Sequence, residues 1–360
     1  MKINLFEPTI TKSEEKKVLE VLRSKFWASG SGIGRVKTFE KNFNRYIGSK
    51  DSLAVNSGTA ALNIALSLID LKGKEVIIPS LSFISTANSI LRNGGKPVFV
   101  DVEPQTLCIN PDLIEDKINS KTAIILPVHF GGIPAHLDKI TKICKKNKLI
   151  LIEDAAHATG ATYKSKKIGS HGFAVCFSFH PVKNLAMPTG GLISLNTKNY
   201  RQIRQNIESL RWCGISNRKN DIYEVNHYGE NYYMNEISAA IGIEQLKKLN
   251  ALNNRRKRIA KIYYEELQID DKMPFEKNSV YHLYWIRTKN REKLRKHLKS
   301  NGIQTGIHYI PIHTFNLYSN KQNLPVTDSV GKEIITLPMH ANLSNDELDF
   351  IISKINKFSN

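Results

Sequence analysis

The stretch Leu149-Ile-Leu-Ile-Glu153 decides the fold, because it is too apolar to have a face in water. Three earlier runs share this character and lie at 75–79, 97–101 and 123–128. Strands of this kind are typical of parallel sheets that are covered on both faces. Segments with helix-like spacing lie between these runs, at 82–91, 111–118 and 137–148. The alternation predicts a doubly wound, mostly parallel α/β sheet, with functional sites at the carboxyl ends of its strands.

The rest of the chain continues this sheet and then changes character. Two more strands are expected at 174–179 and 192–195, and a long helix follows from residue 234 to about residue 267. After residue 272 the pattern is that of an α+β unit, with strands at 280–287 and 302–310 and helices at 292–301 and 345–358. The run at 280–287 alternates like a half-exposed strand. We therefore expect a large α/β domain over 1–245, N-terminal segment included, and a smaller C-terminal α+β domain over 246–360.

The composition is that of an ordinary soluble globular protein: 360 residues, 41% hydrophobic and 24% charged. The first residues lack the charged-then-apolar layout of a signal peptide, and no apolar run nears the roughly 20 residues that a membrane helix needs. The four cysteines are scattered without a CxxC pair, which indicates neither a disulfide frame nor a zinc site. We expect a cytoplasmic protein with no membrane partner.

The charge balance is unusual, since 52 Lys and Arg residues face 33 Asp and Glu residues, for a net charge of +19. Such an excess can mark nucleic-acid binding, can favour a polyanionic small substrate, or can reflect a lysine-rich composition. The basic residues are dispersed, with short runs such as 164–167 and 255–258, and no RNA-binding aromatic signature accompanies them. We interpret them as a solvated surface and expect no nucleic-acid partner.

A second stretch, Cys176-Phe-Ser-Phe-His-Pro-Val-Lys183-Asn184, carries the chemistry. It is an apolar run that enters a turn with a single lysine, and the earlier apolar run closes on Asp154. A lysine that forms a Schiff base, with a buried aspartate that holds a pyridinium nitrogen, is how a chain builds a pyridoxal phosphate (PLP) site. The alternatives are a surface lysine, and an aspartate paired with a backbone amide or a nearby lysine. Lys183 and Asp154 are the expected catalytic residues.

The histidines near these residues do not complete a metal site. Asp154 and His157 could begin one, but no third ligand lies at a suitable spacing. His308 and His313 are five residues apart, which on a strand puts them on opposite faces. We assign no metal.

A phosphate cradle is predicted at Asn56-Ser57-Gly58-Thr59, where a short apolar segment meets a helix of small residues. Glycine lets the backbone approach an anion, the hydroxyl groups add donors, and a helix N-terminus supplies free amides and a positive dipole. A plain helix N-cap is the alternative. Phe83 follows another strand end, so its ring could stack on a planar cofactor, although a lone aromatic residue is more often part of a core.

Taken together, these segments resemble the DegT/DnrJ family of PLP-dependent sugar aminotransferases, which have the aspartate-aminotransferase fold (PLP fold type I). The resemblance runs over nearly the whole chain, from Trp27 to the last helix. It rests on motifs that follow in the family's order, at 27–30, 56–62, 153–157, 177–184, 231–236 and 308–313.

The resemblance implies roles for the residues around the cofactor ring. Lys183 would form the Schiff base, and Asp154 would hold the pyridine nitrogen. His157 would lie against the ring or its hydroxyl, and Phe83 would stack on the ring.

The resemblance also implies how the phosphate and the substrate are held. The residues expected at the phosphate are Gly58, Thr59 and Ser178, joined by Asn231 from the second subunit of a homodimer that shares its active sites. The substrate-side loop from the small domain would contribute His308, Tyr309 and His313.

The implied reaction is a ping-pong transamination. An amino acid, glutamate by family likeness, would donate its amino group, and a nucleotide-linked keto-sugar would receive it. Lys183 separates this activity from that of the related sugar dehydratases, which have histidine at that position. The rival functions are a PLP enzyme for another keto compound, such as a keto-cyclitol, and a non-catalytic regulatory or nucleic-acid-binding protein that reuses the fold.

Two positions depart from the family pattern. Pro188-Thr189 stands where the family has glycine followed by an acidic residue, and Tyr233 stands where many members have arginine. Both changes bear on the sugar pocket and leave the expected PLP residues intact.

Overall fold

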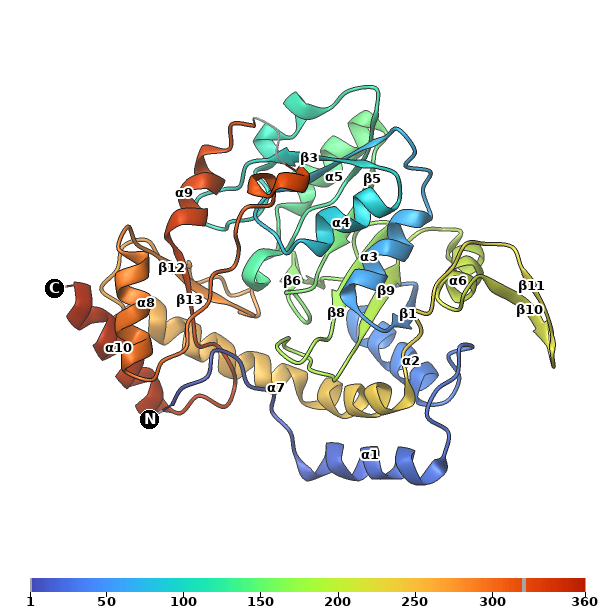
Figure 1. The fold of residues 1–360 in the computed structure, drawn as a ribbon, viewed down its shortest axis with the longest axis horizontal. Helices are drawn as coiled ribbons and strands as arrows, with labels where there is room; N and C mark the ends of the chain where they lie inside the picture. Colours follow the sequence, from blue (N-terminus) through green and yellow to red (C-terminus); the bar gives the residue numbers. More distant parts are fainter. Residues whose placement is uncertain (1, 319–321, 360) are drawn as a thin grey trace.

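Residues 2–318 and 322–359 are described by the computed structural model. Within them, seven strands form one sheet in the order β1-β9-β8-β5-β4-β2-β3, and Figure 1 shows the fold of the chain around it. The strands are β1 (Asp51–Val55), β2 (Glu75–Pro79), β3 (Lys96–Val100), β4 (Thr122–Ile125), β5 (Ile150–Asp154), β8 (Ala174–Ser178) and β9 (Gly191–Leu195). The ladders from β8 to β3 are parallel, and β9 runs antiparallel to both of its neighbours. The predicted mostly parallel α/β sheet is confirmed.

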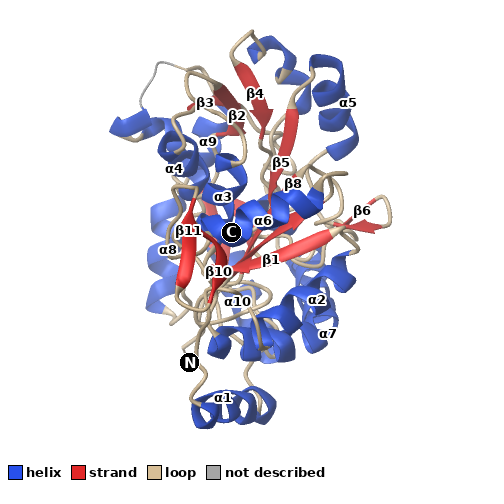
Figure 2. Cartoon of the chain, turned by 90° about the vertical axis from the view of Figure 1, so that its right-hand side faces the viewer, coloured by secondary structure: helices blue, strands red, loops and turns tan. Residues whose placement is uncertain are grey.

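Both faces of the sheet are covered, and Figure 2 shows helices on either side of the strands. Successive residues of a strand point to opposite faces, so Ile77 of β2 joins one buried apolar cluster while Val76 and Ile78 join the other. The first cluster is closed by α2 (Arg35–Ile47), α5 (Leu137–Asn147) and α7 (Glu236–Glu266), and the second by α3 (Gly58–Ser67), α4 (Ser85–Arg92) and α6 (Tyr200–Leu210). Each fully buried Val, Leu or Ile side chain contributes roughly 1.5–3 kcal/mol to the free energy of folding. Burial of these two clusters therefore stabilises the folded sheet.

A smaller α+β group lies beyond the far end of α7 (Figure 1). Its strand β12 (Tyr284–Arg287) pairs antiparallel with β13 (Ile334–Leu337). The helices of this part of the chain are α8 (Arg291–Ser300), α9 (Pro325–Glu333) and α10 (Asn345–Ser359). At the other end of the chain, α1 (Lys12–Ser24) lies along α7, where the Ser13 hydroxyl donates to a Glu244 carboxylate oxygen over 2.7 Å.

Short elements complete the architecture. Two small hairpins pair β6 (Thr162–Tyr163) with β7 (Lys166–Lys167), and β10 (Ile215–Lys219) with β11 (Ile222–Val225). The second hairpin projects from the body of the molecule in Figure 1. Single 3₁₀ turns occur at η3 (Phe130–Gly132), η4 (Ile312–Thr314) and η5 (Asn316–Tyr318). No helix in 2–318 or 322–359 combines the length and the apolar character that crossing a membrane would require.

Three predicted elements are wrong in kind or extent. The helix expected at 111–118 is a pair of 3₁₀ turns, η1 (Pro111–Leu113) and η2 (Glu115–Lys117), because the Ile114 amide bonds back only three residues, to the Pro111 carbonyl. The strand expected at 280–287 begins only at residue 284, since Tyr281 has a φ of +46° and turns the chain. Its residues 280–286 are buried rather than half-exposed.

The third error concerns the strand expected at 302–310. Only isolated bridges remain, between Ile303 and Ile3 and between Gly306 and Thr336. The chain leaves the strand pair after residue 306, because His308 and Tyr309 extend into a cavity at the edge of the large sheet.

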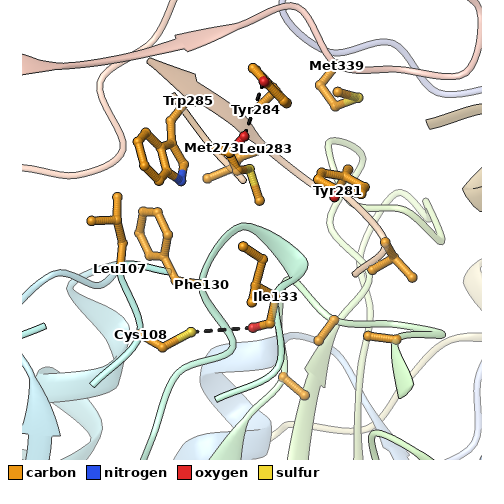
Figure 3. Close-up of a cluster of buried hydrophobic side chains, with 14 of the residues drawn as sticks. Leu107, Cys108, Phe130, Ile133, Met273, Tyr281, Leu283, Tyr284, Trp285 and Met339 are labelled. Carbon is orange, nitrogen blue, oxygen red and sulfur yellow. Dashed lines mark hydrogen bonds between the residues drawn. The ribbon is translucent and has the colours of Figure 1, made fainter. Parts of the chain in front are cut away.

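A continuous apolar core joins the C-terminal group to the loop that follows β4. Figure 3 shows Phe130 and Ile133 from this loop beside Met273, Leu283 and other residues of the C-terminal part. The Tyr284 hydroxyl donates to the Met273 carbonyl over 3.2 Å within this core. The chain segment 281–283 is therefore held at a fixed place against the large sheet.

Candidate active site

A cavity of about 350 Å³ lies at the carboxyl ends of β1, β5 and β8. Strands that run in parallel bring their carboxyl ends to one edge, so residues far apart in the chain meet there. The cavity is lined by most of the predicted site residues, namely Gly58, Thr59, Phe83, Asp154, His157, Ser178, Lys183, His308 and Tyr309. Asn231 and His313 are not among its lining residues.

Lys183 occupies a tight turn between β8 and β9. Its amide donates to the His180 carbonyl over 2.8 Å, and the Met187 amide returns to the Phe179 carbonyl over 2.8 Å. The amine Nζ lies 3.3 Å from Nε2 of His282. Burial lowers the pKa of Lys183 to about 8, against the opposing attraction of Asp154. An amine with this pKa exists in both protonation states near neutral pH, as a group that accepts and returns a proton must.

Asp154 ends β5 and is 5% exposed. One carboxylate oxygen accepts from the Thr86 hydroxyl over 2.8 Å, and the other accepts from the Ala156 amide over 3.1 Å. Burial raises the pKa of Asp154, although the bond from Thr86 opposes the shift. A buried carboxylate without a full countercharge is costly, and a protonated pyridine nitrogen would supply that charge. Glu153 is directed elsewhere, with an oxygen 3.0 Å from Nε2 of His129.

The N-terminus of α3 has the form of an anion cradle. Ser57 is its N-cap, and its hydroxyl accepts from the Ala60 amide over 3.1 Å. The amides of Gly58 and Thr59 precede the first intrahelical bond, so they are free to bind an anion. A Cβ on Gly58 would lie only 2.7 Å from Cβ of Ser178, so this backbone approaches β8 as only glycine allows. The arrangement fits a phosphate group, and together with Asp154 and Lys183 it fits PLP.

His157 lies deeper in the cavity in a defined tautomer. Its Nδ1 accepts from the Gly131 amide over 3.3 Å, so the proton resides on Nε2, which donates to the Tyr309 hydroxyl over 3.0 Å. Burial, reinforced by the charge of Lys183, lowers the pKa of His157 well below its ordinary value. A neutral ring results, which can lie against an aromatic cofactor. Phe83 stands at the mouth with 55% of its surface exposed and its ring 5.9 Å from that of Tyr309.

The histidines of the predicted substrate loop occupy different environments. His308 lines the cavity and bonds to the Thr336 hydroxyl over 2.7 Å, and burial lowers its pKa to about 4. His313 lies outside the cavity, between Ser80 (2.7 Å) and Asp328 (3.0 Å). It therefore anchors the loop to the large sheet.

Asn231 also lies outside the cavity of its own chain. Its side chain is exposed, and its carbonyl accepts from the Asn56 side chain over 3.0 Å. The reach of Asn231 into a second subunit stays a prediction.

Two functional candidates escaped the sequence reasoning. Thr86, in the first turn of α4, carried no sequence signal of its own, since threonine is common at helix starts. His282 lies 99 positions from Lys183 in a segment with a strand-like pattern. Only the three-dimensional structure brings these side chains to the site.

The model of the DegT/DnrJ/EryC1/StrS aminotransferase family matches residues 8–356. The chain belongs to this family. It is 34% identical over 371 residues to the spore coat polysaccharide biosynthesis protein SpsC of Bacillus subtilis, covering 97% of this chain and 95% of that protein. The family assignment confirms the predicted resemblance and makes the protein an aminotransferase that uses PLP.

Solved structures of family members share the fold closely. PseC of Helicobacter pylori, an aminotransferase of pseudoaminic acid biosynthesis, is 30% identical with a TM-score of 0.93, over 99% of both chains. The PLP form of the putative sugar aminotransferase Spr1654 of Streptococcus pneumoniae is 27% identical with a TM-score of 0.94, over 100% of this chain and 99% of that one. The type I fold of PLP enzymes is thereby confirmed for this chain.

Proposed function

We propose that this sugar aminotransferase moves an amino group from an amino acid, glutamate by family likeness, to a nucleotide-linked keto-sugar. The observation that carries the proposal is the amine of Lys183, in one cavity with the carboxylate of Asp154 and the free helix N-terminus at Gly58. A lysine at this position can take a proton from a substrate carbon and return it to another carbon. The sugar-modifying relatives named above support the substrate class.

The residues of the cavity divide the work of holding PLP. Gly58, Thr59 and Ser178 would bind the phosphate, Asp154 would bind the ring nitrogen, and His157 would lie against the ring. When bound, PLP supplies an imine-forming carbonyl and a ring that withdraws electrons from the substrate. Asp154 would hold the ring nitrogen in its protonated form, and the lowered pKa of Lys183 leaves part of its amine free to act as a base.

A homodimer with shared active sites is part of the proposal. Asn231 lies on the surface beside the cavity, where a second subunit could meet it. The projecting hairpin β10–β11 carries exposed apolar side chains, with Ile222 79% exposed and Tyr228, just after it, 89% exposed. Such side chains gain stability when another surface covers them. Asn231 of each subunit would then reach the phosphate in its partner's cavity.

Three further assignments belong to the proposal. Residues 1–245 and 246–360 would be the two domains, with the cavity at their border. The substrate would contact His308 and Tyr309, while His313 would act through the loop that it anchors. The compartment would be the cytoplasm, because the cysteines of the described residues are all free thiols.

The test is amino transfer with the purified protein. The protein is incubated with glutamate and a panel of nucleotide-linked keto-sugars and keto-cyclitols, and amino products and 2-oxoglutarate are measured by mass spectrometry. We expect an aminated nucleotide-sugar, a PLP absorbance band, and loss of both band and product in Lys183→Ala. If only a keto-cyclitol is aminated, the substrate is a keto-cyclitol and not a nucleotide-linked keto-sugar. Unchanged transfer in Lys183→Ala would refute the proposal.

A further inference from the structure

We propose that His282 is a positioning residue for Lys183: its neutral imidazole accepts a hydrogen bond from Nζ and directs the lone pair of the free amine into the cavity. The two nitrogen atoms are 3.3 Å apart. The inference rests on the proposed function, which gives Lys183 its role as a base. The hydrogen bond itself can be tested without an assay of amino transfer.

The imidazole of His282 is buried next to two other rings. The side chain is 2% exposed, and its ring stacks on Phe6 at a centroid distance of 5.6 Å and an interplanar angle of 13°. The ring of His157 lies 4.4 Å away on the cavity side. The backbone amide of His282 donates to the Gly131 carbonyl over 2.9 Å. The neighbouring residues Tyr281 and Leu283 are embedded in the core of Figure 3, so Nε2 has little freedom to move.

The chemistry of the pair sets the direction of the hydrogen bond. A protonated lysine amine has three N–H donors and no acceptor, so Nε2 of His282 must accept from it. When Lys183 loses a proton, an N–H can keep this bond while the lone pair stays free. The lone pair is then aimed away from His282 and toward the other groups of the cavity.

His282 is suited to accept without taking the proton. The charged and titratable groups that act on it most strongly are Lys183, His157, His308 and Arg256, and all four disfavour a positive charge on its ring. Burial and these neighbours lower the pKa of His282 well below its ordinary value. A proton that Lys183 takes up is therefore not passed on to His282, which makes His282 a positioning residue rather than a base.

The experiment measures the titration of Lys183 directly. Full-length protein without added cofactor is labelled with trinitrobenzenesulfonate across pH 6–11, and the modification of the Lys183 peptide is followed by mass spectrometry. His282→Phe keeps an aromatic ring but removes the acceptor, and His282→Gln keeps an acceptor oxygen. His340→Phe is the matched control, since His340 is buried in the same part of the chain and bonds to the Asn4 carbonyl.

We expect His282→Phe to lower the midpoint of the labelling profile by about one pH unit, because the buried ammonium loses a hydrogen bond of the charged class. His282→Gln and His340→Phe should keep the wild-type midpoint. Circular dichroism verifies folding, and His282→Leu replaces the phenylalanine variant if that variant does not fold.

The inference is overturned if the apolar variant titrates like the wild type, or if the glutamine or His340 variants shift as far. In the PLP-loaded enzyme, His282→Phe should lower kcat and leave KM for the keto-sugar unchanged. If the labelling midpoints shift as expected but the wild-type enzyme transfers no amino group to a keto-sugar, only the proposed function is refuted.

Discussion

Gly58→Ala tests whether the start of α3 is a phosphate cradle with no spare room. The new Cβ would lie 2.7 Å from Cβ of Ser178, which is 0.7 Å inside the 3.4 Å at which ordinary contacts begin. Relief requires α3 or β8 to shift, and overpacking of this kind costs about 1–3 kcal/mol. The better helix propensity of alanine returns at most about 1 kcal/mol. We therefore expect a lower free energy of unfolding, and PLP affinity reduced about tenfold or more because the cradle amides move.

The assay separates the packing effect from the loss of binding. Urea unfolding of the protein without PLP gives the free energy of unfolding, and absorbance titration gives the Kd for PLP. Ser178→Gly removes the atom that the new Cβ would meet, so the double variant should regain the unfolding free energy lost in Gly58→Ala. It should still bind PLP weakly, because the Ser178 hydroxyl is gone. Wild-type PLP affinity in Gly58→Ala would show that the phosphate binds elsewhere.

Three other predictions follow from the same site. Asp154→Asn should weaken PLP binding yet stabilise the cofactor-free protein near neutral pH, because burial raises the pKa of Asp154 above its ordinary 3.8 and so disfavours its charged form. In urea unfolding, this gain in the free energy of unfolding should vanish below about pH 4, where the carboxyl is protonated in both states. A gain that persists at that pH would contradict this cause. With Lys183 as the base, kcat for amino transfer should rise with pH and level off above about 8, as the amine loses its proton; a rate that falls over this range would exclude that role. His313→Ala removes the bonds to Ser80 and Asp328, so steady-state kinetics should show a higher KM for the keto-sugar with an unchanged PLP spectrum, whereas a lost PLP band would place His313 at the cofactor.

Much of the fold was predictable because strands that are buried on both faces leave an unmistakable apolar signature. The five residues of β2 are all buried, as is typical of a strand covered on both faces. The errors occurred where local pattern and tertiary contact disagree. Residues 280–283 alternate like a strand, yet Tyr281 turns the backbone so that Leu283 can enter the core against Phe130. No property of the segment by itself specifies that partner.

The candidate site divides along the same line. Asp154, Lys183 and Gly58 follow strand ends, and a parallel sheet gathers strand ends at one edge, so their meeting could be foreseen. His282 reaches the site from the C-terminal part, whose placement depends on how its side chains pack into the continuous core shared with the loop after β4 (Figure 3). That packing is a property of side-chain shape over many residues, which a reading of periodicity cannot supply.

The helix α7 has a consequence for how substrates come and go. Its 31 residues span about 46 Å, from the edge of the large sheet into the C-terminal group, without a break. Near its middle, Asn253 accepts from the side chain of Asn184, the neighbour of Lys183. A hinge motion that separated the large sheet from the C-terminal group would have to bend α7 and would displace the turn that carries Lys183. We therefore expect the large sheet and the C-terminal group to keep their relative positions through the catalytic cycle. Substrates and products would enter and leave through the cavity opening beside Phe83 and Pro188.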